Sequence, residues 1–345
     1  MARLSVAKFL DAHANEVVFT SGSTESNNLA ILGLVQNFSK PHIVTTNIEH
    51  ASVLEVFRHL EKTGLATIDI VPVEESGEVD PRKIKKVLKK NTVLVSVMYA
   101  NNEIGTIEPI REIAKEIRHF NKLNNTKIVF HTDATQAVNY LPINVEKLGV
   151  DLMSFNAAKI YGPKGVGALY VRRGTPVSRI MFGGDQEMGL RPGTENVASA
   201  TALVKALSEV EKIKDKESAR LMKLRDYFID KLKDLSRVHL DNKLIINGGL
   251  ENRLPNNVNI TIPNIPSDLL VIELSAKGVF ASAKSACKSG DGKASHVIKA
   301  IHPDIKDTDG FLRFSLGRQA QKVDIDQTIK ILNQILLKLK KWYTR

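Results

Sequence analysis

The chain has 345 residues, of which 43% are hydrophobic and 25% charged, an ordinary globular composition with ample core for two domains or one large α/β unit. Lys and Arg outnumber Asp and Glu by 49 to 38, but the basic stretches alternate with apolar residues at helical spacing, which indicates solvated helix faces and no direct nucleic-acid binding. No apolar run is long enough to span a bilayer and the first residues do not resemble a signal peptide, so we expect a cytoplasmic protein without membrane association.

The first half of the chain alternates strand-like and helix-like segments. Helical patterns lie between most of the expected strands, for example at 25–38, 51–62, 80–90 and 110–123. This alternation predicts an α/β fold, with a mostly parallel sheet and helices on both faces. A short turn joins the last two strands, which favours an antiparallel pair. The expected strands are residues 16–20, 42–46, 67–73, 92–98, 127–133, 151–156 and 167–171.

The pattern changes from about residue 198. A long helical stretch covers residues 198–236 and is followed by shorter strands and helices, ending in a terminal helix at 326–343. We therefore predict a large α/β domain at 1–212 and a smaller C-terminal α+β domain at 213–345.

Polar and ionisable groups follow the expected strands, where parallel sheets commonly carry function. After the first strand, "SGSTES" begins a helix, so Ser23, Thr24 and the helix N–H groups predict an anion site, with simple helix capping as the alternative. The absence of a Walker lysine disfavours a P-loop nucleotidase.

Two further strand ends complete a recognisable set of groups. Asp133 is placed to receive a ring N–H, and Lys159 to form a Schiff base, although a lysine is most often simply solvated. An anion site, a carboxylate and a lysine together match the needs of pyridoxal phosphate. His50 would stack on the ring and move protons.

The single cysteine, Cys287, excludes an internal disulfide and a cysteine-based metal site. The nine histidines show no HxxxH or HExxH spacing, so we expect no metal. Alone, a single cysteine is most often a small buried hydrophobic residue.

The sequence resembles the cysteine desulfurases of the NifS/IscS family, which are class V aminotransferases of fold-type I. The resemblance covers nearly the whole chain, in family order. The matching stretches are "EVVFTSGSTESNNLAI", "IEHASVL", "VLVSVMYANNEIGTIEPI", "FHTDATQAV", "VDLMSFNAAKIYGPKGVGALYVRR", "GLRPGTENVAS", "SACKS" and "LRFSLGR".

This resemblance implies a role for each matching residue around the cofactor. Lys159 forms the internal aldimine, Asp133 pairs with the pyridinium nitrogen, and His50 stacks on the pyridine ring. Gln136 and Asn102 contact the phenolic oxygen of the cofactor or the substrate.

It also implies a phosphate site, a homodimer and a substrate site. Thr24 and the backbone near Ser23 bind the phosphate, and Thr194 reaches the phosphate of the other subunit. Arg313 holds the substrate α-carboxylate as a bidentate fork.

The implied reaction is the conversion of L-cysteine to L-alanine with a persulfide on Cys287, which supplies sulfur to an iron–sulfur scaffold protein or to tRNA thiolation. Lys284 and Lys288 flank this cysteine and favour its thiolate.

The chain departs from the family pattern in two places that bear on the cofactor. The family usually has Ser-x-His-Lys ending at the aldimine lysine, and this chain has Asn156 and Ala158 in those positions. An Asn amide can donate to a phosphate, whereas an Ala side chain cannot. The chain also begins after a substantial N-terminal segment that family members contain.

Two alternatives to the desulfurase remain open. One is another class V aminotransferase or a selenocysteine lyase. The other is a catalytically impaired paralogue that binds a sulfur acceptor or a scaffold protein; the Ala158 difference favours it, and the retained Lys159, Asp133, His50, Cys287 and Arg313 disfavour it.

Overall fold

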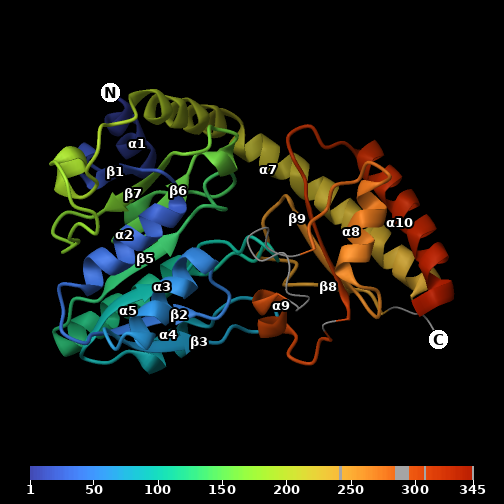
Figure 1. The fold of residues 1–345 in the computed structure, drawn as a ribbon, viewed down its shortest axis with the longest axis horizontal. Coiled ribbons are helices and arrows are strands. Elements are labelled where there is room, and N and C mark those ends of the chain that lie inside the picture. Colours follow the sequence, from blue (N-terminus) through green and yellow to red (C-terminus); the bar gives the residue numbers. More distant parts are fainter. Residues whose placement is uncertain (241–242, 284–294, 307, 344–345) are drawn as a thin grey trace. The chain divides into compact units, whose positions relative to one another are not determined.

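The computed structural model describes residues 1–240, 243–283, 295–306 and 308–343, which form two compact units (Figure 1). The first unit comprises Met1–Val73, Val79–Asn101 and Glu108–Lys214. The second comprises Glu74–Glu78, Asn102–Ile107 and Asp215–Arg345. The two short segments of the second unit that precede residue 108 were not expected from the sequence, which indicated a single division near residue 212.

The first unit is built on a seven-stranded sheet with the order β1-β7-β6-β5-β4-β2-β3. All neighbouring strands from β6 to β3 are parallel, and β7 is antiparallel to both β6 and β1. The mostly parallel sheet and the antiparallel final pair are confirmed. The strands are β1 (Val17–Thr20), β2 (His42–Thr46), β3 (Thr67–Val71), β4 (Thr92–Ser96), β5 (Val129–Asp133), β6 (Leu152–Asn156) and β7 (Gly167–Val171).

Burial explains why these strands lack polar alternation. Every residue of β2, β4 and β5 is buried, so both faces of the central sheet are covered. The edge strand β3 is largely exposed or half-buried. The central strands therefore read as continuous apolar and β-branched runs.

The helices of the first unit pack on this sheet through apolar side chains. In one cluster, Leu29 and Leu34 of α2 meet Phe57 of α3 and Leu94 and Leu152 of the sheet, all essentially inaccessible to solvent. The α-helices are α1 (Ala2–Leu10), α2 (Ser23–Val35), α3 (Ala51–Lys62), α4 (Pro81–Val87), α5 (Ile110–Asn124), α6 (Val145–Leu148) and the first part of α7 (Val197–His239). Short 3-10 turns are η1 (Ala14–Glu16), η2 (Ala158–Ile160) and η3 (Gln186–Gly189).

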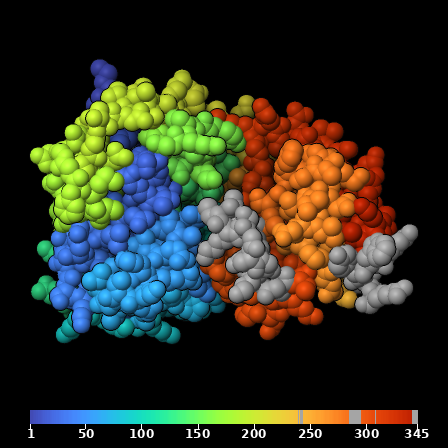
Figure 2. Space-filling model, viewed as in Figure 1, coloured from blue at the N-terminus to red at the C-terminus, as the bar shows by residue number. Residues whose placement is uncertain are grey.

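Between β7 and α7 the chain has little regular structure and lies largely at the surface of the first unit. Its residues 181–185 and 193–196 are exposed, and they belong to the yellow-green surface in Figure 2. Thr194 lies in this segment and is exposed.

The second unit has a three-stranded antiparallel sheet with the order β10-β9-β8. Its core includes an edge-to-face pair, Phe228 of α7 and Phe314 of β10, with ring centroids 5.1 Å apart. The small α+β organisation expected for the C-terminal part is present. The elements are β8 (Ile245–Ile246), β9 (Asn257–Ile262), β10 (Gly310–Ser315), α8 (Ser267–Ser275), α9 (His296–Ile301), α10 (Lys322–Tyr343) and the second part of α7.

Within the described ranges, no helix combines the length and apolarity that crossing a membrane requires.

Candidate active site

The start of α2 and the end of β6 meet in the first unit. Asn156 donates from Nδ2 to Ser23 Oγ at 2.8 Å, and its Oδ1 accepts from the Lys159 N–H at 3.1 Å. One amide therefore ties the first residue of α2 to the turn that carries the lysine. Among the described residues, no side chain caps α2, so its first-turn N–H groups are available as anion donors.

A glycine in β7 allows this close approach. A Cβ at Gly167 would lie 2.8 Å from the Gly22 Cα and 2.7 Å from the Phe155 carbonyl oxygen, distances that real side chains do not reach. The loop that precedes α2 therefore lies directly against β7 because position 167 has no side chain.

The exposed segment with Thr194 is attached to the same helix start. Arg191 Nε donates to Glu25 Oε1 at 2.8 Å, and Glu25 Oε2 accepts from the Ser21 N–H at 2.8 Å. Thr194 follows Arg191 by three residues, and Thr24 is also exposed. Both predicted phosphate-binding threonines are thus accessible to a ligand.

Lys159 lies in η2, directly after β6. Lys159 and Ala158 are both exposed to solvent. The lysine amine is accessible from solvent, as a group that must react with an aldehyde requires. Ala158 provides no side-chain donor, as expected from the sequence.

Asp133 ends β5 and is only 5% exposed. Its Oδ1 accepts from the Thr135 N–H at 2.9 Å, and its Oδ2 accepts from Asn27 Nδ2 at 2.8 Å. Gln136 follows in the same strand-end loop and is half-buried. Two neutral donors thus orient the buried carboxylate of Asp133.

His50 is the residue that caps α3. Its Nδ1 accepts from the Ser52 N–H at 3.1 Å and lies 2.8 Å from Ser52 Oγ. Ser52 Oγ in turn accepts from Asn27 Nδ2 at 2.8 Å. Asn27 and Ser52 therefore connect His50 with Asp133. The sequence analysis did not single out either residue. The signal that could have identified them is a polar residue on the buried face of α2 and of α3.

Glu49 is a further buried group that sequence reasoning missed. Its side chain is fully buried, and Oε1 accepts from the Met98 N–H at 2.8 Å and from Thr46 Oγ1 at 2.9 Å. Burial raises the pKa of Glu49 to about 8, and the charge of Asp133 adds to this effect. The carboxyl group is therefore largely protonated at neutral pH.

The second unit contains the predicted substrate residues Asn102 and Arg313. Arg313 Nη1 donates to the Asn102 carbonyl oxygen at 2.9 Å. Its Nε is buried and has no hydrogen-bond partner among the residues that the structure describes. Burial lowers the pKa of Arg313 from its usual value. An unsatisfied buried guanidinium donor is suited to a carboxylate ligand.

Cys287, the predicted nucleophile, lies outside the described residues, as do Lys284 and Lys288.

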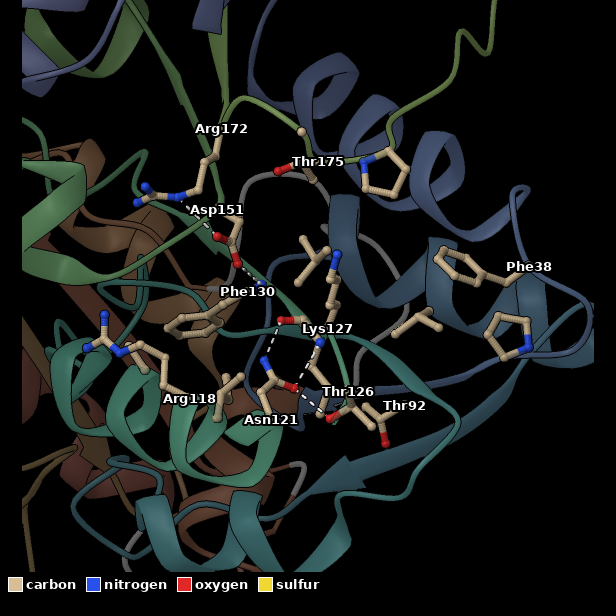
Figure 3. A pocket seen from close by; sticks show the side chains of 18 of the residues that line it. Phe38, Thr92, Arg118, Asn121, Thr126, Lys127, Phe130, Asp151, Arg172 and Thr175 are labelled. Carbon is tan, nitrogen blue, oxygen red and sulfur yellow. Dashed lines mark hydrogen bonds and ion pairs between the residues drawn. The ribbon is translucent and has the colours of Figure 1, made fainter. Parts of the chain in front are cut away.

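A cavity of about 980 Å³ lies at the opposite edge of the first unit's sheet, where β4, β5 and β6 begin (Figure 3). Asp151 accepts from the Phe130 N–H at 2.9 Å and pairs with Arg172 Nε at 3.1 Å. None of the predicted site residues lines this cavity. Its polar groups hold the strand starts together, and the site described above is formed at the strand ends.

Comparisons with known proteins agree on one group of enzymes. The family model described as "Aminotransferase class-V" matches residues 1–328. The chain is 45% identical to "Cysteine desulfurase IscS" of Dictyoglomus turgidum, over 98% of this chain and 84% of that protein. It is 42% identical to "Cysteine desulfurase IscS" of Methanosarcina thermophila, over 99% of this chain and 81% of that protein.

Solved structures give the same result. A structure titled "NIFS-LIKE PROTEIN" superposes with a TM-score of 0.88 at 34% identity, covering 98% of this chain and 87% of that chain. The NifS-like protein from Rickettsia africae superposes with a TM-score of 0.82 at 26% identity, covering 97% of this chain and 86% of that chain.

Proposed function

The chain belongs to the aminotransferase class-V family, and within this family we propose that it is a pyridoxal-phosphate-dependent cysteine desulfurase. The reaction converts L-cysteine to L-alanine and leaves the sulfur as a persulfide on Cys287. The observation that carries the proposal is the Asn156 amide, which holds the start of α2 beside the turn of Lys159. One side chain thereby joins the donors at the start of α2 to the backbone turn that carries Lys159.

The residues present fit pyridoxal phosphate. The uncapped helix start with Ser23 and Thr24 supplies phosphate donors, and Asn156 replaces one of the family's usual side-chain donors. Asp133 is a buried, oriented carboxylate of the kind that binds a pyridinium N–H. Lys159 supplies the amine for the cofactor's aldehyde.

When bound, pyridoxal phosphate supplies an electron sink for the bond that breaks at the substrate α-carbon. His50 would lie on the ring and hold or move a proton, and Gln136 would donate to the phenolic oxygen. Asn102 and Arg313 bind the substrate, with the Arg313 guanidinium on the α-carboxylate.

Cys287 completes the reaction. Its thiolate attacks the sulfur of the substrate, the carbon–sulfur bond breaks with its electron pair on carbon, and protonation there gives L-alanine. The thiol of Cys287 has then become a persulfide, so atoms and electrons balance without another oxidant. The flanking Lys284 and Lys288 favour the thiolate.

We further propose a homodimer in which Thr194 reaches the phosphate of the other subunit, and a cytoplasmic location. The persulfide passes to an iron–sulfur scaffold protein or to a tRNA-thiolating system. The exposure of Thr194 at the surface of the first unit supports the first part.

The function is tested by incubating purified protein, loaded with pyridoxal phosphate, with L-cysteine and a thiol reductant. We expect alanine and sulfide in equal amounts, with Cys287→Ser retaining the cofactor but forming neither product. Alanine and sulfide from Cys287→Ser at the wild-type rate would exclude Cys287 as the nucleophile. A much faster reaction of wild type with L-selenocysteine would favour a selenocysteine lyase.

The competing hypothesis is a catalytically impaired paralogue, because Ala158 has no side-chain donor for the phosphate. It predicts that cofactor-loaded protein releases neither alanine nor sulfide, even at high L-cysteine.

A further inference from the structure

A hydrogen-bonded chain of side chains runs from the buried Asp133 to the half-buried His50 in the first unit. Asn27 is fully buried in α2, and Ser52 is 8% exposed in α3. Asn27 Nδ2 lies 2.8 Å from Asp133 Oδ2 and 2.8 Å from Ser52 Oγ. Ser52 Oγ lies 2.8 Å from His50 Nδ1. Four side chains from three separate parts of the sequence are thus in series.

Chemistry fixes the direction of the first two bonds in this chain, and a backbone contact fixes the third. A carboxylate only accepts, so the Asn27 amide must present its NH₂ group to Asp133. The second hydrogen of that NH₂ group goes to Ser52 Oγ. The hydroxyl of Ser52 has one hydrogen of its own, and that hydrogen is directed to His50 Nδ1 because a backbone N–H already makes this nitrogen an acceptor.

Two further observations agree with this direction. The Ser52 N–H also donates to His50 Nδ1, at 3.1 Å. Asn27 Oδ1 is buried without a hydrogen-bond partner among the described residues, so the amide is oriented by its two donor contacts alone. An inverted amide would place an oxygen against the Asp133 carboxylate.

We propose that Asn27 and Ser52 are positioning residues that hold His50 as the neutral tautomer with its proton on Nε2 and orient Asp133 at the same time. His50 Nδ1 receives two donors and has no room for a proton, so the ring's own N–H is presented by Nε2. This inference rests on the proposed function, in which His50 and Asp133 contact the ring of the cofactor. Asn27 and Ser52 act through those two residues.

The first test measures the tautomer directly, by long-range proton–nitrogen NMR of protein labelled at histidine. His50→Gln assigns the His50 signals. Because each donor on Nδ1 contributes about one ordinary hydrogen bond, the Nε2–H form should exceed the other neutral form by roughly tenfold or more. In Ser52→Ala, where only the backbone N–H of residue 52 still donates to Nδ1, and in Asn27→Ala, where the Ser52 hydroxyl is no longer held, we expect this excess to fall several-fold.

A matched control is Ser96→Ala. Ser96 Oγ lies 2.8 Å from His131 Nδ1, and both residues are fully buried in the same sheet. This variant removes an equivalent serine–histidine contact and should leave the His50 signals unchanged. A wild-type His50 with its proton on Nδ1, or His50 signals unaffected in both Ser52→Ala and Asn27→Ala, would overturn the proposal.

A second test uses kinetics to separate positioning from general packing. In wild type, Ser52→Ala and Asn27→Ala should each lower kcat by roughly three- to tenfold, with KM for L-cysteine nearly unchanged. In a His50→Gln background, Ser52→Ala should alter kcat by less than about twofold, because its target is gone, whereas Asn27→Ala should keep the part of its loss that acts through Asp133. Equal losses from Ser52→Ala in both backgrounds would mean a packing role and contradict the proposal.

The two tests also separate this proposal from the proposed function. The tautomer is measured without cofactor or substrate. If the protein does not desulfurate cysteine but gives the expected NMR result, the proposed function is wrong and the positioning role of Asn27 and Ser52 still holds.

Discussion

Asn156 donates a hydrogen bond of 2.8 Å from Nδ2 to Ser23 Oγ and so ties the end of β6 to the start of α2. The same amide accepts the Lys159 N–H. The residue that replaces a serine of the family pattern therefore also connects the two parts of the expected cofactor site.

The first prediction concerns this amide. Asn156→Ala removes both contacts and a donor for the cofactor phosphate, so affinity for pyridoxal phosphate should fall by roughly ten- to a hundredfold. Titration of the apoprotein by absorbance measures it. Asn144→Ala is the control, because Asn144 caps α6 instead. An unchanged affinity of Asn156→Ala for pyridoxal phosphate would show that Asn156 does not bind the phosphate.

The second prediction concerns the close approach at β7. Gly167→Ala would place its Cβ against the backbone of Gly22 and Phe155, which cannot move easily, so stability should fall by about 1–3 kcal/mol and the cofactor should bind more weakly. Urea unfolding measures the first effect. Gly174→Ala serves for comparison: its Cβ meets open space and its φ of +80° brings only backbone strain, about 1–2 kcal/mol. Normal cofactor affinity in Gly167→Ala would contradict the role given to this contact.

The third prediction follows from the buried carboxyl of Glu49. Its pKa is raised to about 8 in the folded protein, above the value of 4.5 expected for an exposed Glu, so the folded state binds more protons between these two pH values. Its contribution to stability is complete below about pH 4.5 and is lost as the pH rises through 8. Glu49→Gln should remove this loss, on the order of a few kcal/mol, and be more stable than wild type at pH 8.5.

Urea unfolding of wild type and Glu49→Gln at pH 5 and pH 8.5 measures the difference. Glu209→Gln is the control, because Glu209 is exposed and contacts with Lys205 and Lys212 lower its pKa to about 2. Above pH 5 this control should have the pH dependence of wild type. An equal pH dependence of wild type and Glu49→Gln would refute the protonated carboxyl.

The fourth prediction concerns the substrate carboxylate. Arg313→Lys keeps the charge but loses the planar fork, so KM for L-cysteine should rise by roughly ten- to a hundredfold while cofactor binding is unchanged. Steady-state kinetics measure it, with Arg237→Lys on the exposed face of α7 as the control. A wild-type KM in Arg313→Lys would show that another group binds the α-carboxylate of L-cysteine.

The sequence predicted the first unit's sheet well because its strands are buried on both faces. Residues 92–95, for example, form an unbroken run of apolar or β-branched residues for that reason. The predicted ends of helices were less accurate where local backbone geometry determines them. The helix expected at 80–90 ends at Val87, because Leu88 adopts extended backbone angles.

Long-range contacts explain what the sequence did not predict. Glu74–Glu78 belongs to the second unit, where the Gly249 N–H donates to the Ser76 carbonyl oxygen at 2.7 Å across a long separation in the chain. Likewise, the roles of Asn27 and Ser52 depend on hydrogen bonds to residues that are far away in the sequence, so the sequence alone could not indicate them. The placement of Ser23, Asp133 and Lys159 at strand ends was predictable because each follows a strand that is recognisable in the sequence.

The central claim is that Lys159 and the groups around it hold pyridoxal phosphate for reaction with cysteine. The most direct measurement is the absorbance spectrum of the pure protein before and after addition of L-cysteine, beside Lys159→Ala. We expect a yellow protein whose visible band shifts with L-cysteine and is absent from the variant. A colourless protein that pyridoxal phosphate cannot reconstitute would contradict the account and favour the impaired paralogue.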